Sequence, residues 1–270
     1  MDLPDLNSYF QRIGYAGPRT ATLDTLRALH LHHAQAIAFE NLDPLCGRPV
    51  RLDLPSLEQK LVHGSRGGYC FEHNLLFSHV LRELGFNVTG LAARVLWNAP
   101  ESAIRPRGHM LLRVDLPNGA YIADVGFGGL TLTGPLRLVT DVAQTTPHEP
   151  FRLIGADGDF VLQALLRDTW RPLYRFDLQQ QFPADYEVTS WYLSNHPESH
   201  FVRNLMAARP APDRRYGLFN NQLTVHHLDG NTEQRTLRSA AEIRATLETC
   251  FGLRLPNDPQ IDAALTRLIV

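Results

Sequence analysis

The segment that most constrains this chain places a cysteine directly after two glycines, in residues 66–74 (RGGYCFEHN). From Cys70 onward the apolar spacing predicts a helix. The cysteine would then lie at a helix N-terminus, where unpaired N–H groups and a partial positive charge favour the thiolate. Gly67 and Gly68 allow a sharp turn and leave the sulfur uncrowded. A cysteine that only fills a core needs none of this, so the segment predicts a nucleophile.

Composition predicts a globular chain without a nucleic-acid or membrane partner. The 270 residues are 44% hydrophobic and carry a net charge of −2, so they can bury a core but lack the basic excess that holds a phosphate backbone. No apolar run is long enough to span a membrane, and the first residues (MDLPD) do not resemble a signal peptide. Three cysteines, Cys46, Cys70 and Cys250, are a poor disulfide framework, and we expect a cytoplasmic location.

The hydrophobic pattern divides the chain into three stretches. Residues 1–85 read as helical. Residues 86–187 read as short strands joined by turns, and they predict a meander or a small barrel. Residues 188–270 are mixed, with strands followed by a helix. The pattern therefore predicts an α+β fold.

Local signals place individual features within these stretches. Thr22 can cap the first long helix, and Ser239, with Glu242 three residues later, can cap the last. Gly85 ends the helix that begins at Cys70. Residues 208–213 (ARPAPD) read as a loop, not a hinge between independent units.

A nucleophilic cysteine needs a base, and the base needs a group that orients it. His109 stands at the entry of a predicted strand. Asp124 stands at the exit of the next strand, directly before a glycine-rich turn. Because apolar neighbours would shield the Asp124 carboxylate from water, it calls for a partner. We therefore expect His109 and Asp124 to pair.

The turn between these strands decides whether that pair can form. A two-residue turn at Asn118-Gly119 would set Arg113 opposite Asp124 and leave His109 roughly 13 Å further along the strand. A four-residue loop over residues 116–119 sets residue 111 opposite Asp124, and His109 then lies on the same face at a diagonal of about 7–8 Å. We therefore predict that Asn118-Gly119 is not a simple two-residue turn.

Residues 66–74 resemble the signature of the arylamine N-acetyltransferase family. Four further blocks match that family in order: residues 37–42 (IAFENL, with Ala38 where proline is commoner), His109 with Leu112 and Val114, residues 124–128 (DVGFG), and residues 191–201 (WYLSNHPESHF). The resemblance covers almost the whole chain. The long insertion of the vertebrate members is not apparent, so the chain resembles the bacterial type.

The resemblance implies a helical N-terminal domain over residues 1–85, a central β-barrel domain over residues 86–187 and a C-terminal α/β lid over residues 188–270. It also implies a Cys–His–Asp core like that of cysteine proteases. Within the first domain, it implies that Glu40 pairs with Arg66 as a structural clamp under the active-site loop.

The resemblance further implies a reaction, in which an acetyl group passes from acetyl-CoA to an aromatic amine or hydrazine by a ping-pong mechanism. Cys70 would accept the acetyl group, His109 would act as base, and Asp124 would orient His109. No triad position departs from the family pattern. His73 lies close to the nucleophile in sequence, but we expect its side chain to point elsewhere.

The partners implied are CoA and small aromatic substrates. The backbone near the CoA pyrophosphate would come from Gly126, Phe127, Gly128 and Gly129. The aromatic pocket would be lined by Phe39, Phe127 and Phe201. We expect no metal site, since no HExxH or Cys/His zinc spacing occurs among the twelve histidines and three cysteines. The sequence leaves the acceptor amine and the oligomeric state open.

Three other functions remain open from the sequence. An amide synthase would use the same triad to close a macrolactam. A thiol hydrolase of papain or transglutaminase type would share the Cys–His–Asp arrangement but resolve the acyl-enzyme with water. A non-catalytic binding module would leave Cys70 no more reactive than free cysteine.

Overall fold

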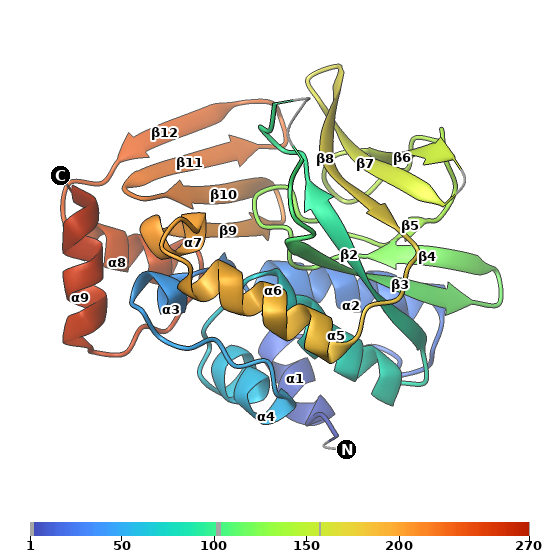
Figure 1. Cartoon of the computed structure of the whole chain (residues 1–270), viewed down its shortest axis with the longest axis horizontal. Helices are drawn as coiled ribbons and strands as arrows, with labels where there is room; N and C mark the ends of the chain where they lie inside the picture. The colour runs from blue at the N-terminus through green and yellow to red at the C-terminus, as the bar shows by residue number, and fades with distance from the viewer. Residues whose placement is uncertain (1–2, 101–103, 157, 270) are drawn as a thin grey trace.

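The computed structural model describes residues 3–100, 104–156 and 158–269. The N-terminal helices lie together at one end of the molecule, and two antiparallel sheets stand side by side above them (Figure 1). The helices are α1 (Leu6–Ile13), α2 (Leu23–Ala36), α3 (Leu42–Leu45), α4 (Leu54–Leu57), α5 (Cys70–Glu83), α6 (Pro183–Asn195), α7 (His200–Arg203), α8 (Ala240–Thr249) and α9 (Pro259–Thr266), with a π-helical turn at Glu58–His63 (η1) and a 3₁₀ turn at Arg267–Ile269 (η2).

The larger sheet has seven strands in the order β5-β4-β3-β2-β8-β7-β6, and it curls into a nearly closed barrel. Its strands are β2 (Asn87–Val95), β3 (His109–Leu116), β4 (Gly119–Ala123), β5 (Leu136–Arg137), β6 (Phe151–Ala156), β7 (Asp159–Leu166) and β8 (Thr169–Asp177). Apolar side chains from every one of these strands fill its interior. The mixed architecture and the barrel-like sheet predicted from the sequence are confirmed.

The β3–β4 hairpin has the register that pairs His109 with Asp124. Leu116 pairs with Gly119 and Leu112 with Ala123, which sets residue 111 opposite Asp124 as predicted. Asn118-Gly119 is not the turn, and this prediction is confirmed. The predicted four-residue loop is wrong, because the turn consists of Pro117 and Asn118 alone. Gly119 supports this tight connection with a φ of +130°, a conformation that favours glycine.

The smaller sheet combines one short strand from the N-terminal part of the chain with four strands from the C-terminal part. It has the order β1-β9-β10-β11-β12, and its strands are β1 (Phe39–Glu40), β9 (Met206–Ala211), β10 (Arg214–Phe219), β11 (Gln222–His227) and β12 (Thr232–Thr236). The loop predicted at residues 208–213 is wrong, because most of that segment forms β9. There β9 pairs with β1 on one side and β10 on the other.

Helix α5 lies in the centre of the molecule and carries the cysteine segment. Its residues are buried on nearly every face, among them Leu76, Phe77 and Val80. The helix begins at Cys70, because Tyr69 is extended and the Glu72 side chain accepts a 3.0 Å hydrogen bond from the Tyr69 N–H. The predicted start of this helix is confirmed, as are the caps at Thr22 and Ser239.

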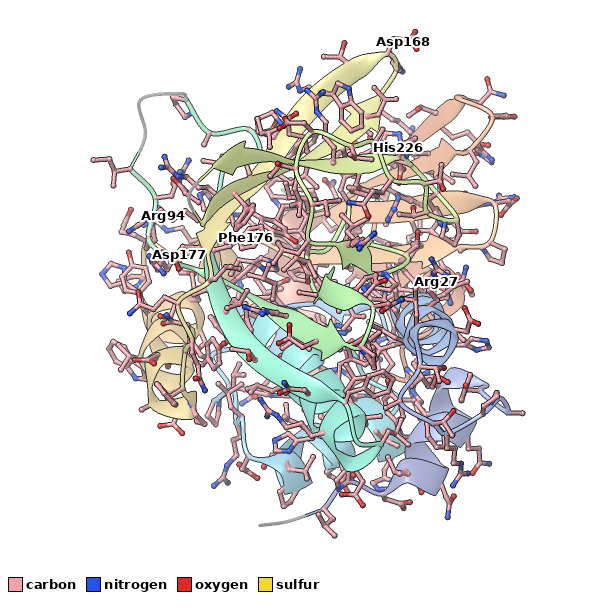
Figure 2. The ribbon with its side chains drawn as sticks, turned by 90° about the vertical axis from the view of Figure 1, so that its right-hand side faces the viewer. Arg27, Arg94, Asp168, Phe176, Asp177 and His226 are labelled. Carbon is pink, nitrogen blue, oxygen red and sulfur yellow. The ribbon has the colours of Figure 1, made fainter. Side chains whose placement is uncertain are left out.

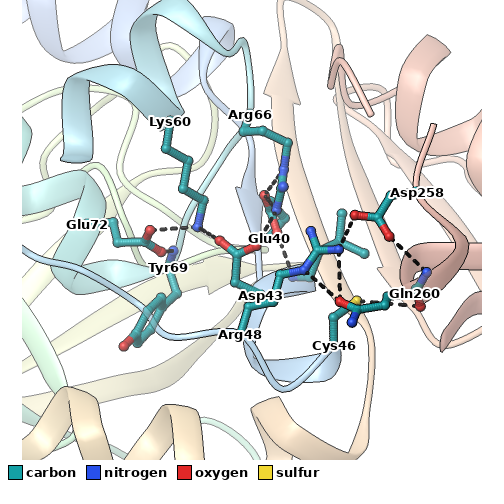
Figure 3. Close-up of polar contacts among 11 residues, drawn as sticks. Glu40, Asp43, Cys46, Arg48, Lys60, Arg66, Tyr69, Glu72, Asp258 and Gln260 are labelled. Carbon is teal, nitrogen blue, oxygen red and sulfur yellow. Dashed lines mark hydrogen bonds and ion pairs between the residues drawn. The ribbon is translucent and has the colours of Figure 1, made fainter. Parts of the chain in front are cut away.

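A buried network of charges lies under the start of α5 (Figure 3). Arg66 contacts Glu40 at 2.7 Å and Asp43 at 3.3 Å, and Lys60 bridges Asp43 at 2.5 Å and Glu72 at 2.6 Å. The clamp between Glu40 and Arg66 that the family resemblance implies is therefore present. The network ties β1, α3 and η1 to the residues that lead into Cys70.

The predicted boundary between residues 187 and 188 falls inside α6, and β1 of the first predicted domain belongs to the sheet of the third. The division into three domains stays a prediction. None of the helices in the described ranges is long and apolar enough to cross a membrane.

We predict that Glu40→Gln lowers the free energy of unfolding by about 3 kcal/mol, because it leaves the Arg66 guanidinium buried without its closest counter-charge. The matched control is Arg27→Met on the outer face of α2 (Figure 2), which breaks an exposed pair with Asp24. The control should change the free energy of unfolding by less than about 0.5 kcal/mol. Urea unfolding measures both, and equal effects would contradict the clamp.

Candidate active site

Cys70 is the first residue of α5, and its side chain is 3% exposed at the edge of a cavity. It is a free cysteine, and its Sγ lies 3.8 Å from the Gly108 carbonyl oxygen. The positive end of the α5 dipole favours a negative charge on this sulfur. The structure therefore places the predicted nucleophile at the positive end of a helix dipole.

His109 is the first residue of β3 and is 3% exposed. Its Nε2 is 2.7 Å from Oδ2 of Asp124, which is fully buried. Its ring packs against Phe127 and Tyr174, with centroids 5.1 Å and 4.9 Å away. Because Nε2 is taken by Asp124, Nδ1 is the nitrogen left for the Cys70 thiol, which is among the groups that raise the pKa of His109.

The electrostatics of the pair favour its charged form. Burial alone would lower the pKa of His109, but Asp124, helped by Cys70, raises it to about 10. Burial alone would raise the pKa of Asp124, but His109 and hydrogen bonds from the Gly126 N–H and Asn74 hold it below its ordinary value. At neutral pH the pair is therefore an imidazolium next to a carboxylate.

Each polar group of Asp124, in its side chain and in its backbone, makes a hydrogen bond. Oδ1 accepts hydrogen bonds from Asn74 Nδ2 at 3.0 Å and from the Gly126 N–H at 2.9 Å. Its carbonyl oxygen accepts a bond from Thr131 at 3.2 Å, and its N–H donates to His30 Nε2 at 3.1 Å. The carboxylate has little freedom to leave His109.

Asn74 lies one helical turn after Cys70 and links α5 to β3 and to the segment directly after β4. Besides Asp124, its amide nitrogen donates to the Met110 carbonyl at 2.8 Å, and its oxygen accepts from the Val125 N–H at 3.1 Å. Asn74 belongs to the cysteine segment, but the sequence analysis predicts no role for it. The spacing of four residues from Cys70 is the signal that could have found it, since residues i and i+4 share a helix face. His30 was also missed.

His73 does not face Cys70, as predicted. Its Nε2 is 3.1 Å from the Ala38 carbonyl oxygen, and its Nδ1 is 2.9 Å from His33 Nε2. A carbonyl only accepts, so His73 donates from Nε2 and accepts at Nδ1. His33 then donates from Nε2 and accepts from the Tyr9 hydroxyl at 2.8 Å. This chain of neutral groups uses both nitrogens of His73 and leaves none for a base.

The cavity at Cys70 has a volume of about 1210 Å³ and runs between the two sheets. All predicted cofactor and substrate residues line it: Phe39, Gly126, Phe127, Gly128, Gly129 and Phe201. The rings of Phe39 and Phe201 lie 6.0 Å apart. Phe127 packs against His109, and Phe201 packs against Tyr69, the residue before Cys70, so the part of the cavity next to Cys70 is aromatic.

Basic groups that sequence reasoning missed line the same cavity. They come from the β7–β8 hairpin, whose tip carries Asp168 in Figure 2, and from β10, β11 and the segment before β6. These residues are His148, Arg167, Arg171, Arg215, His226 and His227. Glu149, also in the lining, pairs with Arg215 at 2.6 Å. Burial lowers the pKa of His148 and of His226, so the net positive charge of the lining comes from Arg167 and Arg171.

No group of three or more His, Cys, Asp or Glu side chains is placed to hold a metal ion in the part of the chain that the structure describes.

Comparisons with known proteins agree with this geometry. A family model of N-acetyltransferases matches residues 22–260. The arylamine N-acetyltransferase of Mycobacterium tuberculosis H37Rv is 47% identical over 268 residues, covering 98% of this chain and 94% of that protein. That of Escherichia coli K12 is 47% identical over 251 residues, covering 93% and 89%. The structure of Mycobacterium marinum arylamine N-acetyltransferase in complex with CoA matches with a TM-score of 0.95 at 45% identity, over 98% of this chain and 100% of that one.

These matches define the class of the protein as an N-acetyltransferase. They are long and similar enough to fix the family as well. The chain belongs to the arylamine N-acetyltransferase family, and the resemblance noted in the sequence is confirmed.

We predict that Gly126→Ala lowers the free energy of unfolding by about 1–3 kcal/mol, because the added Cβ would lie 2.8 Å from the Cys70 Cα and 3.0 Å from Asn74 Nδ2. In the control Gly134→Ala, the nearest atom is Pro147 Cδ at 3.8 Å, an ordinary contact. Urea unfolding compares the two. A Gly126→Ala protein as stable as the control would show that the Asp124 loop is not packed against α5 as described.

Proposed function

We propose that this chain transfers an acetyl group from acetyl-CoA, through an acetyl-cysteine at Cys70, to the nitrogen of an arylamine or arylhydrazine. The observation that carries the proposal is the pairing of His109 with Asp124 beside Cys70, at the aromatic end of a large cavity. The names of the relatives support the substrates, and the CoA complex of the Mycobacterium marinum protein supports the donor.

The cavity suits CoA as a donor because its two ends differ. The end at Cys70 can take the acetyl thioester, and the basic groups along the remainder fit the negative phosphates of CoA. Gly126, Gly128 and Gly129 would let the protein backbone approach the CoA pyrophosphate. A side chain at Gly126 would also collide with Cys70, because an added Cβ would lie 2.8 Å from the Cys70 Cα.

In the first half-reaction, the Cys70 thiolate attacks the acetyl carbonyl, a sulfur–carbon bond forms and the bond from carbon to the CoA sulfur breaks. CoA leaves as a thiolate and takes the Nδ1 proton of His109, which leaves the imidazole neutral. Asp124 keeps the ring oriented through Nε2 during this transfer. The N–H groups at the start of α5 can stabilise the oxyanion that forms on the way.

In the second half-reaction, the amine nitrogen attacks acetyl-Cys70. Neutral His109 accepts the proton that the nitrogen loses, and the thiolate leaves to restore the ion pair. An arylamine is neutral at pH 7, so its lone pair is available without prior deprotonation. Phe39, Phe127 and Phe201 would stack on its ring at the site where it reacts.

We predict that Cys70→Ala abolishes CoA release from acetyl-CoA in the presence of an arylhydrazine, because the acetyl acceptor is gone. The control is Cys46→Ala, which removes a free, half-buried cysteine that is not among the residues lining the cavity. Released CoA is measured with a thiol reagent. Equal CoA release by the Cys70→Ala and unaltered proteins would overturn the proposal.

We predict that Asp124→Asn changes the pH dependence of Cys70 alkylation by iodoacetamide. Without the carboxylate, burial lowers the pKa of His109 and the imidazole is neutral at pH 7, so no positive charge remains on His109 to stabilise the Cys70 thiolate. Alkylation of the unaltered protein should vary little between pH 7 and 9, whereas that of Asp124→Asn should rise with pH.

The matched control for this experiment is Asp115→Asn on the same hairpin, since Asp115 pairs with Arg113 at the surface. It should keep the profile of the unaltered protein. Acetyl transfer by Asp124→Asn should fall by a factor on the order of 10³–10⁴. If Asp124→Asn keeps the unaltered pH profile, Asp124 does not set the charge of His109.

A further inference from the structure

A buried histidine of α2 contacts the backbone of Asp124, whose carboxylate binds His109. His30 is fully buried, and its Nε2 accepts the hydrogen bond from the Asp124 N–H at 3.1 Å. Its ring meets Phe77 of α5 edge-on at 5.9 Å. Asp124 therefore lies between two imidazoles, one bound to its carboxylate and one to its backbone.

The direction of this hydrogen bond fixes the state of His30. Because a backbone N–H can only donate, Nε2 carries no proton and the neutral ring carries it on Nδ1. Burial lowers the pKa of His30 to about 4, against the pull of the nearby Asp124 carboxylate. His33 is a second titratable neighbour, and burial lowers its pKa as well. His30 is thus neutral at the pH at which Asp124 and His109 are charged.

Packing alone does not explain a histidine at this position. Nδ1 of His30 is buried and has no hydrogen-bond partner among the described residues. A buried donor without a partner destabilises the fold, and an apolar side chain would avoid this cost. The histidine does, however, provide an acceptor for the Asp124 N–H, which an apolar side chain cannot do.

The neutrality of that acceptor matters for the chemistry. A carboxylate in its place would set a second negative charge beside Asp124 and favour protonation of both. A cation would compete with His109 for the Asp124 carboxylate. A buried, neutral imidazole orients the peptide that carries Asp124 and leaves its charge directed at His109.

We propose that His30 is a positioning residue for acyl transfer: it accepts the Asp124 N–H and thereby fixes the aspartate in the orientation that holds His109. The proposal rests on the proposed function for its consequence in acetyl transfer. Its structural part, the effect on the charge state of His109 and Cys70, can be measured without any substrate.

The test compares two substitutions of His30 by amide side chains of different length. In His30→Gln the amide oxygen can stand where Nε2 stands, whereas in His30→Asn it stands near the position of Nδ1 and cannot reach the Asp124 N–H. Iodoacetamide alkylation of Cys70 is followed against pH. We expect His30→Gln to stay within about threefold of the unaltered rate at pH 7, and His30→Asn to be about tenfold slower with its profile moved to higher pH.

His32→Asn is the control, since His32 lies on the same helix and bonds the Ile13 carbonyl at 3.0 Å, away from Asp124. It should leave rate and profile unchanged. If His30→Asn does not unfold cooperatively, His30→Leu, which also lacks the acceptor, replaces it. Two results would overturn the proposal: unaltered profiles in both His30 amide variants, or equal slowing in both without a shift in pH.

The same variants separate this proposal from the proposed function. If the unaltered protein transfers no acetyl group from acetyl-CoA to arylhydrazines, the proposed function fails, and the alkylation profiles still decide the role of His30. If acetyl transfer occurs and the profiles of the two His30 amides coincide, the function stands and the positioning role falls.

Discussion

The buried pair of His109 and Asp124 is the interaction on which the rest of the site depends. Two charged groups, 3% and 0% exposed, are 2.7 Å apart, and neither would stay charged there without the other. The pair fixes the ring of His109 through Nε2 and leaves Nδ1 for Cys70. A small displacement of Asp124 would therefore change the charge of the imidazole and, through it, that of the sulfur.

The surrounding fold limits such a displacement from several directions. Asn74 brings the carboxylate and the β3 backbone to the helix that carries Cys70. Gly126 lets the loop after Asp124 lie directly on that helix, and His30 holds the loop from α2. Beneath the helix start, the charge network around Arg66 fixes the glycine turn before Cys70 (Figure 3). Segments far apart in the sequence thus converge on one carboxylate.

Part of this could be predicted from the sequence, because it follows from local rules. The apolar neighbours of Asp124 predict a buried carboxylate that needs a partner, and strand geometry gives the register that brings His109 to it. Helix caps at Thr22 and Ser239 follow from residue type and spacing. The place of Cys70 at the start of α5 follows from the two glycines and the apolar pattern after them.

The remainder depends on contacts that no local pattern encodes. Residues 208–213, which contain Pro210 and Pro212, predict a loop, but pairing with β1 and β10 makes most of this segment part of strand β9. His30 accepts a hydrogen bond from the backbone N–H of Asp124, which is distant in the sequence. The apolar pattern of α2 does not predict this bond. The basic residues of the cavity come from separate strands and meet only in the folded chain.

The most direct test of the account is the mass of the protein after incubation with acetyl-CoA alone and then with an arylamine. If Cys70 carries the acetyl group, the protein gains one acetyl group on the peptide that contains Cys70. This group persists without an amine and is transferred to the arylamine when one is added. An unmodified Cys70, or an acetyl-cysteine that water removes as fast as the amine does, would contradict it.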